Sequence, residues 1–186
     1  MPMSDESLVF ASDTKSFMIS GSYLDQSVQR MVASLVFFFR EKLDEAQLRA
    51  GLEGTLGEFP VYNSRIKMNG DVLQFDCSNQ GVRFYSQELD VTLEESLGWL
   101  HTDKAKKLSG AGQVGAIMKG REAVTGFCLS HFRGGGSALG VSFHHSVGDL
   151  QSTMSLMHHW SARVEGAGSS LNLGGGLARR AGLSAA

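Results

Sequence analysis

The segment Ser142-Phe143-His144-His145-Ser146-Val147-Gly148-Asp149 decides the predicted fold of this 186-residue chain. A strand-like run with alternating apolar residues ends in it, and an amphipathic helix-like segment follows at once. His145 and Asp149 are four residues apart, the first where the strand gives way to a turn and the second where a helix begins. A carboxylate at a helix start accepts backbone N–H bonds. A histidine, with its unperturbed pKa of about 6.5, can take a proton from a hydroxyl or amine near neutral pH.

The two neighbouring histidines of this segment are predicted to have different roles. Side chains alternate along a strand, so His144 and His145 point to opposite faces, and only one of them can be the base. Alternation does not choose between them, but the four-residue spacing to Asp149 selects His145. His144 is then a packing or hydrogen-bonding neighbour, or a residue that contacts the substrate.

The sequence before this segment predicts helices and strands in alternation. Residues 43–59 carry an apolar helical face that ends before Pro60, which cannot continue a helix. Asn69-Gly70 predicts a type I′ hairpin turn between strands at residues 61–66 and 72–77. A buried strand is predicted at 31–39, a short strand at 82–85, and a helix that a capping box at Thr92 and Glu95 opens. Residues 104–122 are predicted to be a polar and mobile connector. Paired strands follow at 123–132 and 137–144, joined by a glycine turn at 134–136.

The composition indicates one globular domain and disfavours several classes of protein. A hydrophobic content of 42% is sufficient for a single core. A net charge of −2, without a basic stripe, gives no reason to expect nucleic acid as a partner. Cys77 and Cys128 lack CxxC spacing and are expected to be buried reduced thiols. Neither a secretory signal nor a span of roughly 20 apolar residues is visible, so we expect a cytoplasmic protein that does not bind membranes.

Several blocks resemble the BAHD acyltransferases and follow the order of that family. Residues 123–162 are similar to the region around the family's HxxxD motif. Residues 22–26 (SYLDQ) are similar to the family's opening motif, and residues 35–40 (LVFFFR) to its first long strand. Residues 56–66 (LGEFPVYNSRI) are similar to its FYPLAGRL segment, and residues 75–84 (FDCSNQGVRF) to the hairpin that follows. HxxxD spacing alone is a weak signal, but four blocks in the right order are a strong one.

The resemblance implies an α/β (α+β) fold like that of chloramphenicol acetyltransferase, with a mixed sheet flanked by helices. It covers residues 8–164 and matches one half, the N-terminal half, of the usual two-domain enzyme. We therefore expect residues 1–164 to form an acyltransferase N-terminal-type domain. The Gly/Ala-rich residues 165–186 are expected to be a disordered tail or the result of a truncated or shifted reading frame.

The activity implied by the resemblance is transfer of an acyl group from a coenzyme A thioester to a hydroxyl or amine of a small-molecule acceptor. His145 would act directly on the acceptor as general base, and Asp149 would support the loop through a salt bridge, although Leu150 replaces the family's usual glycine. Asp25, in the opening motif, would border the acceptor channel or cap a helix. Acyl-CoA would be a co-substrate, with no tightly bound cofactor and no metal.

Alternatives to this interpretation remain open. The chain could be a truncated, non-catalytic fragment that at most binds a partner chain. Homo-oligomerisation could instead complete the site between subunits, as in the trimeric chloramphenicol acetyltransferases. A metal site built from His144, His145, Asp149 and His158 is disfavoured, because it lacks the one-turn spacing of two imidazoles on one helical face.

Overall fold

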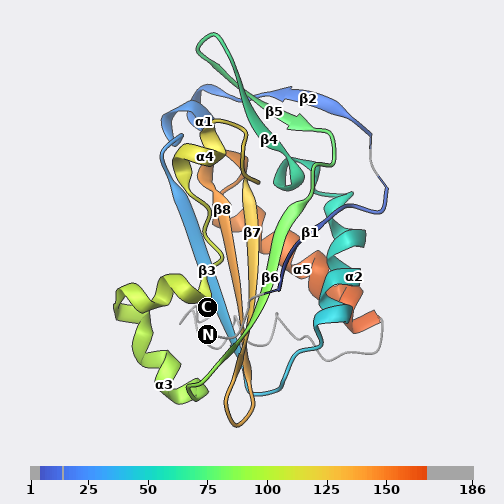
Figure 1. The fold of residues 1–186 in the computed structure, drawn as a ribbon. Helices are drawn as coiled ribbons and strands as arrows, with labels where there is room; N and C mark the ends of the chain where they lie inside the picture. Colours follow the sequence, from blue (N-terminus) through green and yellow to red (C-terminus); the bar gives the residue numbers. More distant parts are fainter. Residues whose placement is uncertain (1–4, 14, 167–186) are drawn as a thin grey trace, which may run out of the picture.

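The computed structural model describes residues 5–13 and 15–166, which form a mixed α/β fold with two sheets (Figure 1). The larger sheet has five strands in the order β1-β6-β7-β8-β3, of which only the β6–β7 pair is parallel. The smaller sheet has three antiparallel strands in the order β2-β5-β4. The strands are β1 (Asp5–Val9), β2 (Phe17–Ser20), β3 (Val32–Phe39), β4 (Arg65–Asn69), β5 (Val72–Cys77), β6 (Val82–Leu89), β7 (Thr125–Phe132) and β8 (Ser137–His144).

Helices lie against the large sheet and around its ends (Figure 1). Two of them, α2 (Glu45–Leu56) and α5 (Leu150–Gly166), pack against each other beside the sheet. The short α-helices are α1 (Tyr23–Ser27), α3 (Leu93–Leu97) and α4 (Val114–Met118), and the 3₁₀ helices are η1 (Pro60–Asn63), η2 (Gly98–His101), η3 (Asp103–Leu108) and η4 (His145–Val147).

Trp160 on α5 is central to the core between the helices and the sheet. Its side chain is fully buried, and its ring meets that of Phe127 on β7 edge-on at 5.1 Å between centroids. The indole Nε1 donates a hydrogen bond of 2.8 Å to the carbonyl oxygen of Leu48 on α2, so the polar end of this side chain is satisfied inside the core. Gly51 lets the two helices approach closely, because a Cβ there would lie 2.6 Å from Val164 Cγ2.

The opposite face of β7 and β8 is covered by the main chain from the end of η3 to Gly110. Gly140 faces the carbonyl of Leu108 so closely that a Cβ would overlap it, and a Cβ on Gly126 would lie 2.6 Å from the carbonyl oxygen of Gly110. All residues of β7 and β8 are consequently buried. The expected mobile connector at 104–122 is therefore wrong, because its Leu108 and Ile117 are buried and it forms η3 and α4.

Several other elements differ in detail from the sequence predictions. The hairpin between β4 and β5 pairs Asn69 with Val72, which leaves Gly70 and Asp71 as the turn, and of these only Gly70 has positive φ. Positive φ at the first turn position alone is the pattern of a type II′ turn, not the predicted type I′. The strand predicted from residue 61 begins at Arg65, because η1 occupies the residues before it. The predicted buried strand at 31–39 is β3, a half-buried strand at the sheet edge that pairs with β8 alone among the described residues.

Three further local expectations agree with the structure, whereas the expected tail is not tested. Thr92 and Glu95 form the predicted capping box at the start of α3. The three glycines at 134–136 all have positive φ and make the turn between β7 and β8. Cys77 and Cys128 are buried and unpaired. Of the expected tail at 165–186, the first two residues belong to α5, and residues 167–186 lie outside the described part.

Candidate active site

The site predicted from the sequence lies where β8 ends. β8 runs to His144, η4 begins at His145, and α5 begins at Leu150. The backbone N–H of His144 donates to the carbonyl of Val124 at 2.8 Å, and that of His145 donates to the carbonyl of Met31 at 2.8 Å. The turn is thus held between the chain that enters β7 and the chain that enters β3.

His144 is fully buried, and both of its ring nitrogens are engaged. Nε2 lies 2.8 Å from the carbonyl oxygen of Gln29, which can only accept, so this nitrogen carries the proton. Nδ1 then accepts from the hydroxyl of Ser146 at 2.6 Å. Burial lowers the pKa of His144, and the nearby His145 acts in the same direction. A substrate contact through His144 would require one of these hydrogen bonds to break.

The neighbouring His145 ring is in a different situation. It is partly exposed, and its nearest aromatic neighbour is Phe143, with ring centroids 6.3 Å apart. Within residues 5–13 and 15–166, neither of its ring nitrogens has a hydrogen-bond partner. Of the two adjacent imidazoles, His145 is therefore the one with nitrogens available to an incoming molecule.

Asp149 caps α5, as its position in the sequence predicted. Its Oδ1 accepts from both the backbone N–H and the hydroxyl of Ser152, each at 2.8 Å. These two hydrogen bonds lower the pKa of Asp149, because they favour the charged carboxylate. No ion pair to this carboxylate occurs among the described residues, so the salt bridge implied by the resemblance has no counterpart in this part of the chain.

Asp25 is part of a capping box at the start of α1. The helix cap itself is Ser22, whose backbone N–H donates to Asp25 Oδ2 at 2.7 Å, while Asp25 N–H donates to Ser22 Oγ at 3.2 Å. Asp25 is thus the third residue of the helix rather than its cap. The helix that carries Asp25, α1, contacts η4, which begins at His145.

Three residues that the sequence did not single out also shape the turn. Tyr62 of η1 is buried, and its hydroxyl lies 3.0 Å from Thr153 Oγ1 in the first part of α5. A Cβ on Gly148 would overlap the Tyr62 hydroxyl. No sequence pattern marks this contact, because Tyr62 and Thr153 are 91 residues apart.

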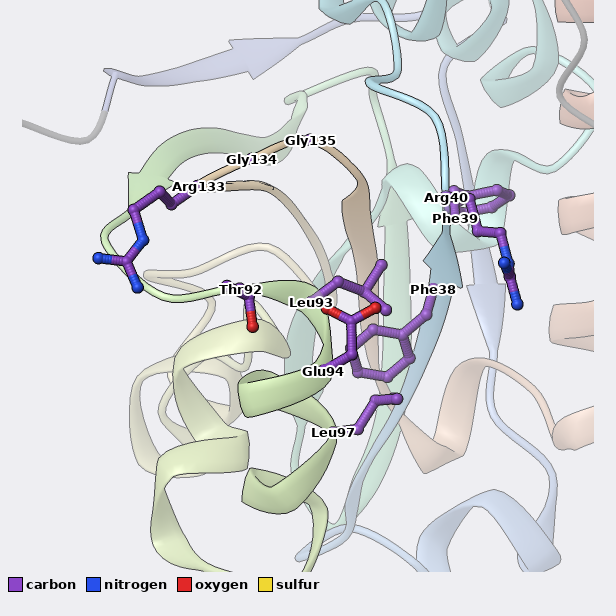
Figure 2. A pocket seen from close by; sticks show the side chains of 10 residues that line it. All are labelled: Phe38, Phe39, Arg40, Thr92, Leu93, Glu94, Leu97, Arg133, Gly134 and Gly135. Carbon is purple, nitrogen blue, oxygen red and sulfur yellow. The ribbon is translucent and has the colours of Figure 1, made fainter.

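Cavities lie at both ends of β8. A cavity of about 350 Å³ adjoins the site and is lined by Phe59, Asp149 and three residues of the first turns of α5. A larger cavity of about 530 Å³ lies between β3, α3 and the glycine turn, where Phe38, Leu93 and Leu97 face one another and Arg133 lies to one side (Figure 2). The ends of an eight-residue strand are about 23 Å apart, so this larger cavity is remote from His145.

The metal site weighed in the sequence analysis would use His144, His145, Asp149 and His158. Among the residues that the structure describes, no group of three His, Cys, Asp or Glu side chains is placed to hold a metal ion. His158 is an exposed residue of α5. Within the same residues, no helix is long and apolar enough to cross a membrane.

Comparison with known proteins identifies the family. The model of the Transferase family, whose members are the BAHD acyltransferases, matches residues 3–172. The chain belongs to this family. Rosmarinate synthase from Plectranthus scutellarioides is 30% identical over 124 residues, which cover 67% of this chain and 28% of the relative. Hydroxycinnamoyltransferase from Narcissus pseudonarcissus is 28% identical over 160 residues, which cover 82% of this chain and 36% of the relative.

Solved structures share the fold. Vinorine synthase aligns with a TM-score of 0.71 at 24% identity, covering 87% of this chain and 42% of that one. A protein of F. sporotrichioides, solved in complex with coenzyme A and T-2, aligns with a TM-score of 0.61 at 16% identity, covering 81% of this chain and 41% of that one. These alignments confirm the expected fold of the chloramphenicol acetyltransferase type. The chain spans about one third of the length of the curated relatives that it matches.

Proposed function

We propose that this chain forms part of an acyl-CoA-dependent acyltransferase that moves an acyl group from a coenzyme A thioester to a hydroxyl or amine of a small-molecule acceptor. One observation carries the proposal: at the HxxxD motif of an acyltransferase family, the His145 ring nitrogens have no hydrogen-bond partner among the described residues, whereas those of His144 are both bonded. The relatives support the same chemistry, since they include proteins named as acyltransferases and one solved with coenzyme A.

His145 is the general base in this proposal. A free imidazole nitrogen takes the proton from the acceptor O–H or N–H while the acceptor atom attacks the thioester carbonyl. The tetrahedral intermediate then expels the sulfur of coenzyme A, which takes that proton back from the imidazolium. No bond forms between the acyl group and the protein.

Asp149 supports this base indirectly. Its carboxylate is held by the backbone N–H and hydroxyl of Ser152, so it organises the start of α5 rather than the proton transfer. Asp25, through the contact of α1 with η4, is proposed to border the path of the acceptor. Cys77 and Cys128, both free and buried, are consistent with a cytoplasmic location, which we include in the proposal.

The proposed active site needs a second protein surface to enclose its substrates. Exposed apolar side chains surround the motif: Tyr23 and Leu24 on α1, Met31 beside the His145 backbone, and Leu150 next to Asp149. Apolar surface of this kind is typical of an interface. We propose that further chain of a longer enzyme, or a second copy of this chain, covers it and completes the binding site.

The alternative is a non-catalytic domain whose only role is to bind a partner chain through this surface. To decide, the purified protein is mixed with several acyl-CoA thioesters and a panel of alcohols and amines, and release of the coenzyme A thiol is followed over a range of protein concentrations. Turnover that His145→Ala abolishes and His158→Ala retains supports the acyltransferase. Specific activity that rises with concentration supports completion by a second copy. Turnover retained in His145→Ala contradicts the proposed base. No turnover at any concentration, either by this chain alone or by the longer enzyme that contains it, favours the binding role.

A further inference from the structure

Tyr62 lies directly beneath the turn that carries His145 and Asp149. Its side chain is 4% exposed, and its hydroxyl oxygen is 3.0 Å from Thr153 Oγ1. The same hydroxyl fills the space that a side chain at position 148 would need, since a Cβ on Gly148 would overlap Oη and lie 3.0 Å from Cζ. The Tyr62 hydroxyl therefore fits against the turn only because residue 148 is a glycine.

Tyr62 ends a segment, residues 58–62, that runs along α5 and that we call the brace. Glu58 accepts from His159 Nδ1 at 2.8 Å and pairs with Arg163, both in the second half of the helix. Phe59 packs edge-on against His159 at 5.1 Å and against Tyr62 at 6.4 Å between ring centroids. Because the brace contacts α5 near both ends, it fixes the position of the helix and of the turn that precedes it.

The chemical state of Tyr62 suits this role. Burial raises the pKa of the phenol, and the negative charge of Asp149 raises it further, so the group stays a neutral hydroxyl at physiological pH. A neutral hydroxyl can donate one hydrogen bond and accept others. The bond to Thr153 is thus maintained across the pH range in which an imidazole titrates.

The turn is held from two sides. On one side, the carbonyl oxygens of Gln29 and Met31 accept from His144 Nε2 and from the His145 backbone. On the other side, Tyr62 supports Gly148 and Thr153. We propose that Tyr62 is a positioning residue, whose hydroxyl sets the height of the turn from His145 to Asp149 and thereby the direction of the His145 imidazole; its consequence for catalysis rests on the function proposed above.

The imidazole C–H signals in NMR spectra, recorded at one pH, test this placement without any assay of activity. The variants are Tyr62→Phe and Thr153→Val, which remove one partner each with little change in shape, together with the double variant. The spectrum of His145→Asn identifies the His145 signal. Tyr85→Phe is the matched control, because Tyr85 is a half-buried tyrosine on β6 that lies opposite Cys128 of β7, away from the turn.

The His145 signal is expected to move in Tyr62→Phe and in Thr153→Val, and the double variant is expected to match the single ones, because all three break the same bond. Tyr85→Phe should leave it in place, and the signal of His131, at the other end of the sheet, should stay constant throughout. An unmoved His145 signal in folded variants would overturn the proposal and leave the hydroxyl with a packing role only. If Tyr62→Phe does not fold, Thr153→Val decides the question by the same signal.

Kinetics supply a second and separate test. In a preparation that transfers acyl groups, Tyr62→Phe is expected to lower kcat by about ten- to a hundredfold with KM changed less than about twofold, as for a misdirected base. A higher KM with unchanged kcat would contradict the positioning role. If no preparation transfers acyl groups, neither this chain at high concentration nor the longer enzyme that contains it, the proposed function fails, while the imidazole signal still decides the role of Tyr62.

Discussion

His144 and Gln29 are joined by a hydrogen bond of 2.8 Å across 115 residues of sequence, from the imidazole Nε2 to the backbone carbonyl oxygen. The bond attaches the chain after α1 to the end of β8. It also fixes the tautomer of His144, so this residue serves as a structural neighbour of the proposed base.

We predict that His144→Ala lowers the free energy of unfolding by about 2–4 kcal/mol, because it leaves a cavity and removes the partners of Gln29 and Ser146. His158→Ala, at an exposed position in the middle of α5, is expected to change the free energy of unfolding by less than about 0.5 kcal/mol. Urea unfolding of both variants measures the difference. Equal, small effects would contradict the structural role of His144.

Stability is expected to fall as the pH is lowered through the histidine range. Burial lowers the pKa of His144 and of His131 in the folded state, so the unfolded chain binds more protons below about pH 6.5. The stabilising contribution is complete above that pH and is lost as the pH falls through the folded-state values. Unfolding in urea at several pH values between 7 and 5 should show that the free energy of unfolding depends less steeply on pH in His144→Gln than in the unaltered protein. Identical pH dependence in the two proteins would contradict the contribution of His144.

Asp149 variants separate a helix cap from a salt bridge. Asparagine caps helices about as well as aspartate, whereas alanine costs about 1 kcal/mol. We therefore expect Asp149→Asn to keep the melting temperature and Asp149→Ala to lower it. Asp44, which caps α2 by accepting from Gln47 N–H at 3.1 Å, provides a matched pair of variants. If Asp149→Asn lowers the melting temperature as much as Asp149→Ala does, the negative charge itself is needed.

Two glycines of α2 are expected to respond in opposite directions to alanine. Alanine favours a helix by roughly 0.8–1 kcal/mol over glycine. At Gly54 the new methyl group would meet only the long Arg163 side chain, with Nη1 at 3.1 Å, which can shift slightly, so Gly54→Ala should stabilise the protein. At Gly51 it would meet Val164 Cγ2 at 2.6 Å and should destabilise it, with Val164→Ala restoring part of the loss. Thermal unfolding of Gly54→Ala, of Gly51→Ala and of Gly51→Ala combined with Val164→Ala shows whether each melting temperature rises or falls.

Both cysteines are expected to be unreactive in the folded protein. Burial raises the pKa of the Cys77 thiol to about 11 and also raises that of Cys128, so neither forms much thiolate at pH 8. Ellman's reagent should therefore label no thiol in the native state and two after denaturation. Rapid labelling of either cysteine in the native protein would contradict the buried packing, and it would also interfere with an assay for the coenzyme A thiol.

The sequence predicted the parts of the fold that depend on local patterns. The strand pair around the glycine turn, the helix ending before Pro60 and the capping box at Thr92 all follow from short-range chemistry. The connector at 104–122 was expected to be mobile because it is polar and glycine-rich. It is ordered because the two strands that follow it, β7 and β8, offer Gly126 and Gly140, on which its backbone can lie.

The candidate site was predictable in part for the same reason. The spacing of His145 and Asp149 is local, and the Asp149 cap is a local interaction. The contacts that hold the turn are not local: Gln29, Met31 and Tyr62 come from segments that only tertiary packing brings to β8. A single sequence carries no signal for such pairings.

The pairing of β3 with β8 has a consequence for biosynthesis. Val32 lies opposite His144, so 112 residues separate the two ends of this ladder. At typical ribosomal rates of 5–20 residues per second, the apolar β3 segment waits on the order of ten seconds for its partner strand to emerge. Throughout that interval it presents Leu35 to Phe39 to other nascent chains and to chaperones. A charged substitution at Ser34, the exposed position within β3, would be expected to raise the yield of soluble protein during expression while leaving the finished fold unchanged.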